Sequence, residues 1–283
     1  MTELSTGLEP EIGHGLDEAS LHPAEVDLLC AYAEIAPPFP LRVPSLGATT
    51  AERRTVFGSA RATLAARGLA DHRGPRGVAA DFVYLLRDGV GALDMIVTRR
   101  GQAVGALILA RREDALLISQ DRARDDAQVR LRAMSVHDAV ERMLRLVPDL
   151  NAAMAAPFSL PRDTIGRVHR EIVGIIATPG PDGRPRQIGA DELDRLLSAH
   201  NLDEQLARRM VTNLQPVLGN GQAGVAVRRG YADEWTRSGE ELRWLDTGRG
   251  RFRLAGMGDW MSVNPLTREE LRGELRGLAQ ELW

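Results

Sequence analysis

The stretch ALDMIVTRRGQAVGALILARREDALLISQD, residues 92–121, decides the fold class of this chain. It contains three apolar runs, which are separated by Arg100-Gly101 and by Glu113-Asp114. Both dipeptides favour tight hairpin turns. Connections this short join antiparallel strands, because a parallel pair needs a much longer crossover. The stretch therefore predicts an antiparallel meander.

Three segments before this meander place apolar residues at helical spacing. The first has Pro23 in its first turn, the second begins with a capping box of Thr49 and Glu52, and the third covers residues 77–89. Between the first two helices, FPLRV at residues 39–43 is expected to form a short edge strand that its prolines limit. The chain is therefore expected to begin with helices and then change to strands.

A fourth strand and a helix are predicted to follow the three apolar runs. Residues 127–133 alternate apolar and Arg side chains, which indicates a strand with one polar face. Ser135 then caps a helix that Pro148 ends. Residues 150–190 mix Pro, Gly and Asp with short apolar pieces, which is typical of a long irregular connection, and one helical turn or strand is expected within it at EIVGIIA, residues 171–177.

The rest of the chain follows the same order of elements. Two helices are predicted at residues 190–200 and 203–218, ahead of a second antiparallel meander. Its expected strands are GQAGVAVRRG, GEELRWLDTG, RFRLAGM and DWMSVNP. A last helix begins after a capping box of Thr267 and Glu270, and its buried residues are expected to be Leu271, Leu275, Leu278 and Leu282.

This order of elements predicts the fold class and the organisation of the chain. Helices, meander and helix occur twice, which indicates an α+β fold with two similar halves that share one mostly antiparallel sheet. The halves are expected at residues 21–150 and 151–283, and together they form a single domain. Residues 1–20 are acidic and glycine-rich with no apolar period, so we expect a disordered tail there.

The composition argues against several functional classes. With 283 residues, a formal net charge of -3 and a pI near 6.1, the chain does not have the charge of a strongly basic nucleic-acid-binding protein. Its single cysteine, Cys30, cannot form an internal disulfide, and no apolar leader or membrane-spanning run is present. The six histidines show no metal-ligand spacing. We therefore expect a cytoplasmic protein without membrane insertion, metal or cofactor.

Asp246 belongs to an Asp-Thr-Gly triplet, the triplet that presents the catalytic carboxylate of aspartic proteases. That chemistry needs two carboxylates that share a proton, and this chain has one triplet. The flanking alternation instead predicts a hairpin turn at residues 247–250, followed by Arg251 and Arg253 as solvated side chains on a strand. A hydrolase that uses Asp246 in a dimer, and nucleic-acid binding through the arginines, are kept as alternatives.

The glycines of GNGQAG, at 219, 221 and 224, match the G-x-G-x-x-G dinucleotide fingerprint. The fingerprint needs a strand before it and a helix N-terminus after it, because the helix N-terminus holds the pyrophosphate. Here the predicted order is the reverse, so we interpret the motif as the end of a helix that leads into a strand. Cys30 lies on an apolar helical stripe, which favours a buried thiol over a nucleophile. The sequence thus indicates no catalytic residue and no enzyme.

The chain resembles the EspG family, the cytosolic chaperones of the ESX (type VII) secretion systems of actinobacteria. The resemblance spans residues 21–283 and rests on the order and spacing of several stretches. These are LHPAEVDLL, LAARGLAD, ALDMIVT, AVGALILARREDALLIS and WLDTGRGRFRLAGMGDWMSVNPLTREELRGELRGL. It implies a central, strongly twisted, mostly antiparallel sheet with helical bundles at its sides and pseudo-twofold halves. It also implies that the chain binds the apolar tip of a PPE-like protein in a PE-PPE heterodimer and keeps that protein soluble.

The resemblance also implies which residues contact the partner. In the family, the partner is held by the loop between the two central strands and by the C-terminal helical bundle. The loop corresponds here to Arg99, Arg100, Gly101 and Gln102, and it is very short. The bundle corresponds in part to the helices that contain Leu193, Leu196, Leu197, Leu206, Met210 and Leu214, although an inward-facing stripe of this kind is more often core. Exposed strand edges leave a homodimer open as well.

Overall fold

The computed structural model describes residues 17–112, 114–124, 126–162, 195, 199, 204–228 and 235–282. Its helices are α1 (Pro23–Ala33), α2 (Thr50–Ala66), α3 (Val78–Asp88), α4 (Val136–Leu146), α7 (Glu204–Leu214), α8 (Arg268–Ala279) and the short 3-10 helix η1 (Gln280–Leu282). Its strands are β1 (Glu18–Leu21), β2 (Ala70–Asp71), β3 (Gly74–Pro75), β4 (Gly91–Arg99), β5 (Gln102–Arg111), β6 (Asp114–Asp121), β7 (Val129–Ser135), β8 (Phe158–Pro161), β9 (Val217–Val227), β10 (Thr236–Thr247), β11 (Gly250–Met257) and β12 (Trp260–Pro265).

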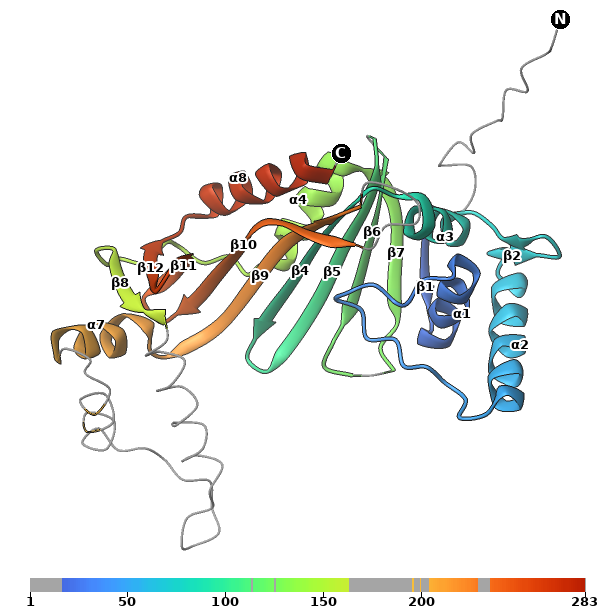
Figure 1. Cartoon of the computed structure of the whole chain (residues 1–283), viewed down its shortest axis with the longest axis horizontal. Coiled ribbons are helices and arrows are strands. Elements are labelled where there is room, and N and C mark those ends of the chain that lie inside the picture. The colour runs from blue at the N-terminus through green and yellow to red at the C-terminus, as the bar shows by residue number, and fades with distance from the viewer. Residues whose placement is uncertain are drawn as a thin grey trace, which may run out of the picture. The chain divides into compact units, whose positions relative to one another are not determined.

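Ten strands form one sheet in the order β1-β7-β6-β5-β4-β9-β10-β11-β12-β8, and β2 pairs with β3 separately (Figure 1). The pairs from β1 to β4 and from β10 to β8 are antiparallel. The predicted α+β fold with a mostly antiparallel sheet is confirmed, and so are both meanders. The predicted helix starts at Pro23, Thr49, Ser135 and Thr267 are also confirmed, since each has the expected proline or cap.

Two compact units divide the chain. The first comprises Met1–Pro148, Gln222–Glu241 and Arg272–Trp283, and the second comprises Asp149–Gly221 and Leu242–Leu271. The sequence predicts halves that are each continuous along the chain, whereas these units interleave. The units interleave because a unit boundary falls inside each of β9, β10 and α8. One end of each of these elements therefore belongs to the first unit and the other end to the second.

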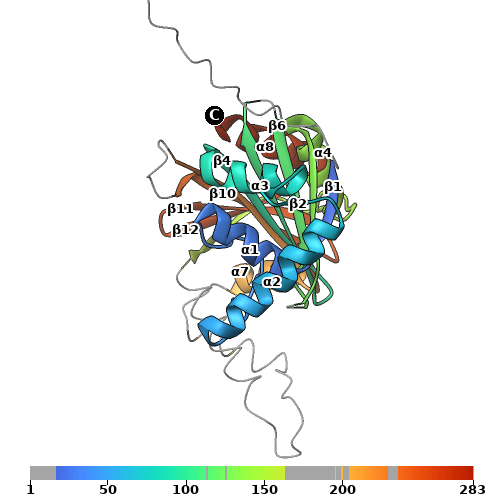
Figure 2. The same ribbon diagram turned by 90° about the vertical axis from the view of Figure 1, so that its right-hand side faces the viewer.

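The neighbouring strands β5 and β6 of the first unit are buried on both faces over most of their length. Leu107, Leu109 and Leu116 belong to a core cluster with residues of α1, α2 and α3, which lie together on one side of these strands (Figure 2). Ala106, Ile108 and Ala110 alternate with them and are also buried, and α4 packs against β5, β6 and β7. The apolar run at 106–110 does not alternate with polar residues because both faces of β5 are buried.

Three boundaries differ from those that the sequence predicts. Strand β1 begins at Glu18, inside the expected tail, because its backbone pairs with the edge of β7. Residues 39–43 form no strand, since the side-chain amide of Gln120 bonds both the N–H and the C=O of Arg42 at 2.7 and 2.9 Å. The second hairpin turn begins at Arg112, and Asp114 already pairs in β6. The expected strand or helical turn near residue 175 lies outside the described residues.

The second unit has a smaller core, around Phe158, Leu160, Phe252 and Val263. Phe158 and Phe252 meet edge to face with ring centroids 6.4 Å apart. Phe158 and Leu160 belong to strand β8, which pairs with β12. This strand lies in the segment that is expected to be irregular. Helix α7 ends at Leu214, four residues before the predicted end, and β9 begins directly after Pro216 because proline cannot continue a helix.

Asp81 gives the fold a predicted dependence on pH. It lies in the first turn of α3, where burial first, and then the charges of Asp17 and Asp114, raise the pKa of its carboxyl to about 6. The folded state holds this proton more tightly than the unfolded chain does, so this group's contribution to stability falls as the pH rises from about 4 to about 6.

We expect Asp81→Asn to raise the free energy of unfolding at neutral pH by about 1 kcal/mol, a value discounted for partial exposure and for the lost favourable charge at the helix N-terminus. The gain should vanish near pH 4, where the native carboxyl is protonated. Urea unfolding at neutral pH and near pH 4 measures the free energy of unfolding of the two proteins. Asp88→Asn, at the other end of the same helix, is the control. An equal gain at both pH values would contradict this origin.

Candidate functional site

The hairpin between β4 and β5 presents its tip to solvent. Arg99 and Gln102 pair across it, and Arg100 and Gly101 form the bend with φ values of 49° and 80°. Positive φ at both central residues is typical of the two-residue hairpin turn, and Gly101 meets that requirement without steric cost. All four residues are exposed to solvent. The tip therefore offers two cations and free polar groups to another molecule, and the predicted turn is confirmed.

The ring of Phe39 contacts two guanidinium groups, and one of them belongs to Arg122, whose backbone pairs next to this tip. Arg122 donates its backbone N–H to Ala103 at 2.7 Å, directly beside Gln102. Its guanidinium carbon lies 5.9 Å from the centroid of Phe39, and that of Arg237 lies 5.6 Å from the same centroid. Phe39 is still 46% exposed. Cation–π contacts hold the ring in place while its exposed area stays open to contact.

Asp94 anchors Arg237 beneath that ring. The carboxylate is buried on β4 and accepts hydrogen bonds from both terminal nitrogens of Arg237. Burial raises the pKa of Asp94 above its ordinary value, although the hydrogen bonds and charge of Arg237 act in the opposite direction. The sequence does not indicate this group, because Phe39 and Arg237 are far apart along the chain and no local motif links them.

Helix α7 turns its predicted partner-binding residues toward the core of the second unit. Leu206, Met210 and Leu214 are half-buried and pack against the cluster of Phe158 and Phe252. Their exposed parts line the same helix face. Leu193, Leu196 and Leu197 lie outside the described residues, so their assignment stays a prediction.

A group of exposed apolar side chains flanks the turn at Gly248 and is here called the turn patch. It consists of Met154, Val217 and Leu218, which are 94%, 47% and 37% exposed. The backbone N–H of Met154 donates to Arg249 at 3.3 Å, and that of Gly248 donates to Pro216 at 3.0 Å, so two segments meet at the turn. Val217 and Leu218 are consecutive in β9 and so point to opposite sides, and exposed apolar residues beside one turn are candidates for contact with another protein. The sequence placed Val217 and Leu218 in a helix and so missed the patch.

Asp246 is not positioned for catalysis. The predicted hairpin is confirmed, since Thr247 pairs with Gly250. However, the expected solvated position of Arg251 is wrong: Arg251 is 0% exposed and Asp246 is 4% exposed. Arg251 donates from Nε and Nη2 to the two carboxylate oxygens at 2.7 and 3.0 Å. A carboxylate with both oxygens bonded to a buried guanidinium stabilises the hairpin and is not presented to a substrate.

The G-x-G-x-x-G motif is also structural. Gly219, Gly221 and Gly224 all lie within β9, so the expected helix end is wrong, and the motif does not lead into a helix N-terminus within residues 204–228 that the structure describes around it. A Cβ at Gly221 would lie 2.0 Å from the indole of Trp244, which is 1% exposed. The glycine is required here because the indole packs directly on the strand backbone.

Other features give no sign of chemistry in the described part of the chain. Cys30 is buried, and burial, with a smaller effect of Asp27, raises the pKa of its thiol to about 12, which leaves almost no thiolate. Among the described residues, no three His, Cys, Asp or Glu side chains gather as they would around a metal. No described helix is both long and apolar enough to cross a membrane.

Comparison with known proteins places this geometry in a family. The family model for the EspG family matches residues 22–277. No curated protein matches the sequence. Among solved structures, the chain is similar to the Mycobacterium tuberculosis type VII secretion system chaperone EspG5 in complex with the PE25-PPE41 dimer, with a TM-score of 0.61 and 10% sequence identity over 92% of this chain and 95% of that chain. At this identity the structural similarity shows a shared fold. The family model matches most of the chain, and the chain therefore belongs to the EspG family.

Proposed function

We propose that this protein is a cytoplasmic chaperone of a type VII secretion system that binds a PE-PPE-type heterodimer and does not act as an enzyme. The observation that carries the proposal is the family match over residues 22–277, supported by the fold shared with a chaperone solved on a PE-PPE dimer. The ion-paired Asp246 is consistent with a binding role. Covering an exposed apolar surface of a partner is the physical means by which such a chaperone prevents aggregation.

Two separate groups of residues are proposed to contact the partner, one within each unit. In the first unit the group is the hairpin tip, Arg99 to Gln102, whose side chains are exposed. In the second unit the group is the turn patch with the exposed parts of Leu206, Met210 and Leu214. The apolar residues would cover the apolar tip of a PPE-like subunit, and the arginines would fix its orientation through polar contacts.

The proposal is tested by co-expression of the tagged chain with a PE-PPE pair encoded in the same genome. The pair should become soluble and co-purify with the chain, and it should aggregate when expressed without it. If every such pair in the genome is equally soluble with and without the chain, the assignment to PE-PPE substrates fails.

The contribution of the tip is tested by a double charge reversal. Because the hairpin bend is exposed and makes no core contact, Arg99→Glu with Arg100→Glu should leave the melting temperature unchanged and weaken binding of the pair about tenfold, which corresponds to about 1.4 kcal/mol. Isothermal titration calorimetry with the purified pair measures the affinity. Arg130→Glu, on the exposed face of β7, is the control. Equal affinity of all three proteins would remove the tip from the contact surface.

A further inference from the structure

A groove between α1 and α2 is a second surface that the proposed function does not use. It has a volume of about 550 Å³ and shares no residue with the hairpin tip or the turn patch. Its lining residues are Leu28, Ala31, Tyr32, Thr50, Arg53, Arg54, Phe57, Gly58 and Arg61. The lining is thus apolar and aromatic, with three arginines and no carboxylate. Such a composition is suited to an apolar occupant that carries negative charge.

The two aromatic rings of the groove are held in place by arginines. The guanidinium carbon of Arg53 lies 4.4 Å from the ring centroid of Phe57, and that of Arg61 lies 5.9 Å from the centroid of Tyr32. Arg61 also donates to the phenol oxygen of Tyr32 at 2.7 and 3.1 Å. Rings that are already fixed lose little conformational entropy when another side chain packs on them.

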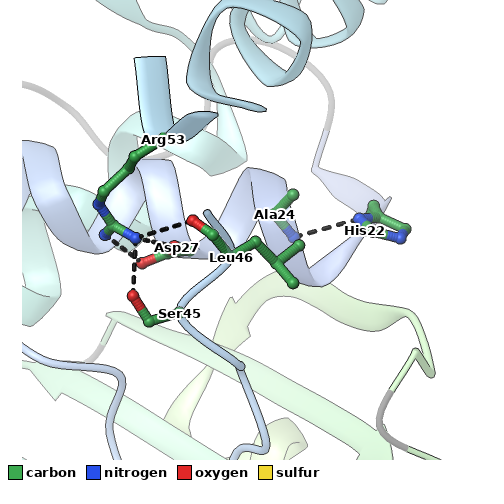
Figure 3. Close-up of polar contacts among 6 residues, drawn as sticks. All are labelled: His22, Ala24, Asp27, Ser45, Leu46 and Arg53. Atoms are coloured by element: carbon green, nitrogen blue, oxygen red, sulfur yellow. Dashed lines mark hydrogen bonds and ion pairs between the residues drawn. The ribbon is translucent and has the colours of Figure 1, made fainter. Parts of the chain in front are cut away.

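Arg53 is fixed in turn by its own partners, as Figure 3 shows. It donates to both carboxylate oxygens of Asp27 at 3.0 Å, to the hydroxyl of Ser45 at 2.7 Å and to the carbonyl of Leu46 at 3.3 Å. Its charge is therefore compensated within the unit, and its role in the groove is to support Phe57.

The other two arginines keep uncompensated charge. Arg61 bonds a neutral phenol, and Arg54 is exposed on α2. Within the residues that the structure describes, neither has an ion-pair partner. Two cations at the edge of an apolar groove favour an occupant with Asp or Glu at matching positions and disfavour one with Lys or Arg.

Gly58 adds an independent observation. It lies in the interior of α2, where glycine is a poorer helix former than alanine, and its φ is not in the left-handed region. A Cβ built at Gly58 would meet no atom within 4 Å, so nothing in the described chain requires a glycine there. Ala31 also lines the groove, and two such small residues leave room for a third helix to approach α1 and α2 closely.

We propose that the groove between α1 and α2 binds an amphipathic helix of a partner protein, apolar on one face and flanked by Asp or Glu. Two packed helices with an open apolar groove form a site of the helix-in-groove kind, in which a third helix completes the bundle. The charge of Arg54 and Arg61 selects an acidic helix, and Gly58 sets how closely it lies.

The test uses a synthetic helical peptide of about 18 residues with Leu at positions i, i+3, i+4 and i+7 and Glu on both flanks, and a twin with Lys in place of Glu. Fluorescence anisotropy should show binding of the Glu peptide, at least about tenfold weaker binding of the Lys peptide, and a decrease with added salt. No binding, or equal affinity of the two peptides, would overturn the proposal.

Variants separate binding from folding. Gly58→Gln should raise the melting temperature by about 2 °C because Gln is the better helix former, yet weaken Glu-peptide binding at least about tenfold by filling the groove. Gly273→Gln, at an equally open helical glycine of α8, should stabilise without affecting binding. Unchanged binding in Gly58→Gln would overturn the proposal.

A truncated chain without residues 1–16 tests another occupant. If the Glu peptide binds only after these residues are removed, the occupant is the chain's own acidic segment, and the proposal of a partner helix is overturned.

Discussion

Replacing Arg251 with Ala is expected to lower the free energy of unfolding by about 3–5 kcal/mol, the largest effect of any single change proposed for this protein. The guanidinium is 0% exposed, and its loss would leave the buried carboxylate of Asp246 without the two hydrogen bonds at 2.7 and 3.0 Å. An uncompensated charge at this depth is costly because the surrounding residues cannot replace water. Chemical denaturation, followed by tryptophan fluorescence, measures the change.

The control for this change lies on the same strand. Arg253 is two residues away on β11 and is half-buried, so Arg253→Ala should cost less than about 1 kcal/mol. The double replacement Arg251→Met with Asp246→Leu removes both charges, and it should recover most of the loss. A small effect of Arg251→Ala, or no recovery in the double variant, would show that the ion pair does not hold this hairpin.

Gly221→Ala is expected to destabilise the fold by about 3 kcal/mol although it adds a single methyl group. The new Cβ would lie 2.0 Å from the Cζ2 atom of Trp244, whose rigid indole is buried and has no space into which to move. A Cβ at Gly224, on the same strand, would instead meet the flexible end of Arg237 at 2.9 Å, so Gly224→Ala should cost much less. Thermal unfolding of the two variants compares them directly.

A double-mutant cycle identifies the collision as the cause. Trp244→Phe replaces the indole with a smaller ring and removes Cζ2 and Cη2, two of the three atoms nearest to the added Cβ. Gly221→Ala should therefore cost only about 1 kcal/mol when it is introduced into Trp244→Phe, which corresponds to an interaction energy of about 2 kcal/mol between the two sites. If the two effects simply add, the glycine is required for another reason.

Local patterns predicted most of the fold. Tight turns such as Arg100-Gly101 imply antiparallel neighbours, and capping boxes such as Thr49 with Glu52 define helix starts, because both depend on residues adjacent in the sequence. The collinear order of these elements carried the resemblance to the family, and the family model bears it out. The hairpin tip was predictable for the same reason, since a turn at the end of two long strands is exposed.

The incorrect predictions share a different physical origin. Arg251 has the same alternating pattern as an exposed strand residue, but segments far away in sequence cover it: its N–H donates to Asn151 and its C=O accepts from Leu266. The edge strand expected around Arg42 is absent because Gln120, 78 residues away, takes the place of a neighbouring strand. Which face of an element is covered depends on tertiary neighbours that a local pattern does not contain.

The central claim is that this chain holds one PE-PPE-type heterodimer, and the most direct measurement is the molar mass of the complex. Size-exclusion chromatography with multi-angle light scattering, on material co-purified after co-expression, gives that mass without a standard. We expect one species whose mass is the sum of one copy of this 30.9 kDa chain, one PE-type subunit and one PPE-type subunit. A chain that elutes at its own mass or a multiple of it, with the pair elsewhere or aggregated, would contradict the account.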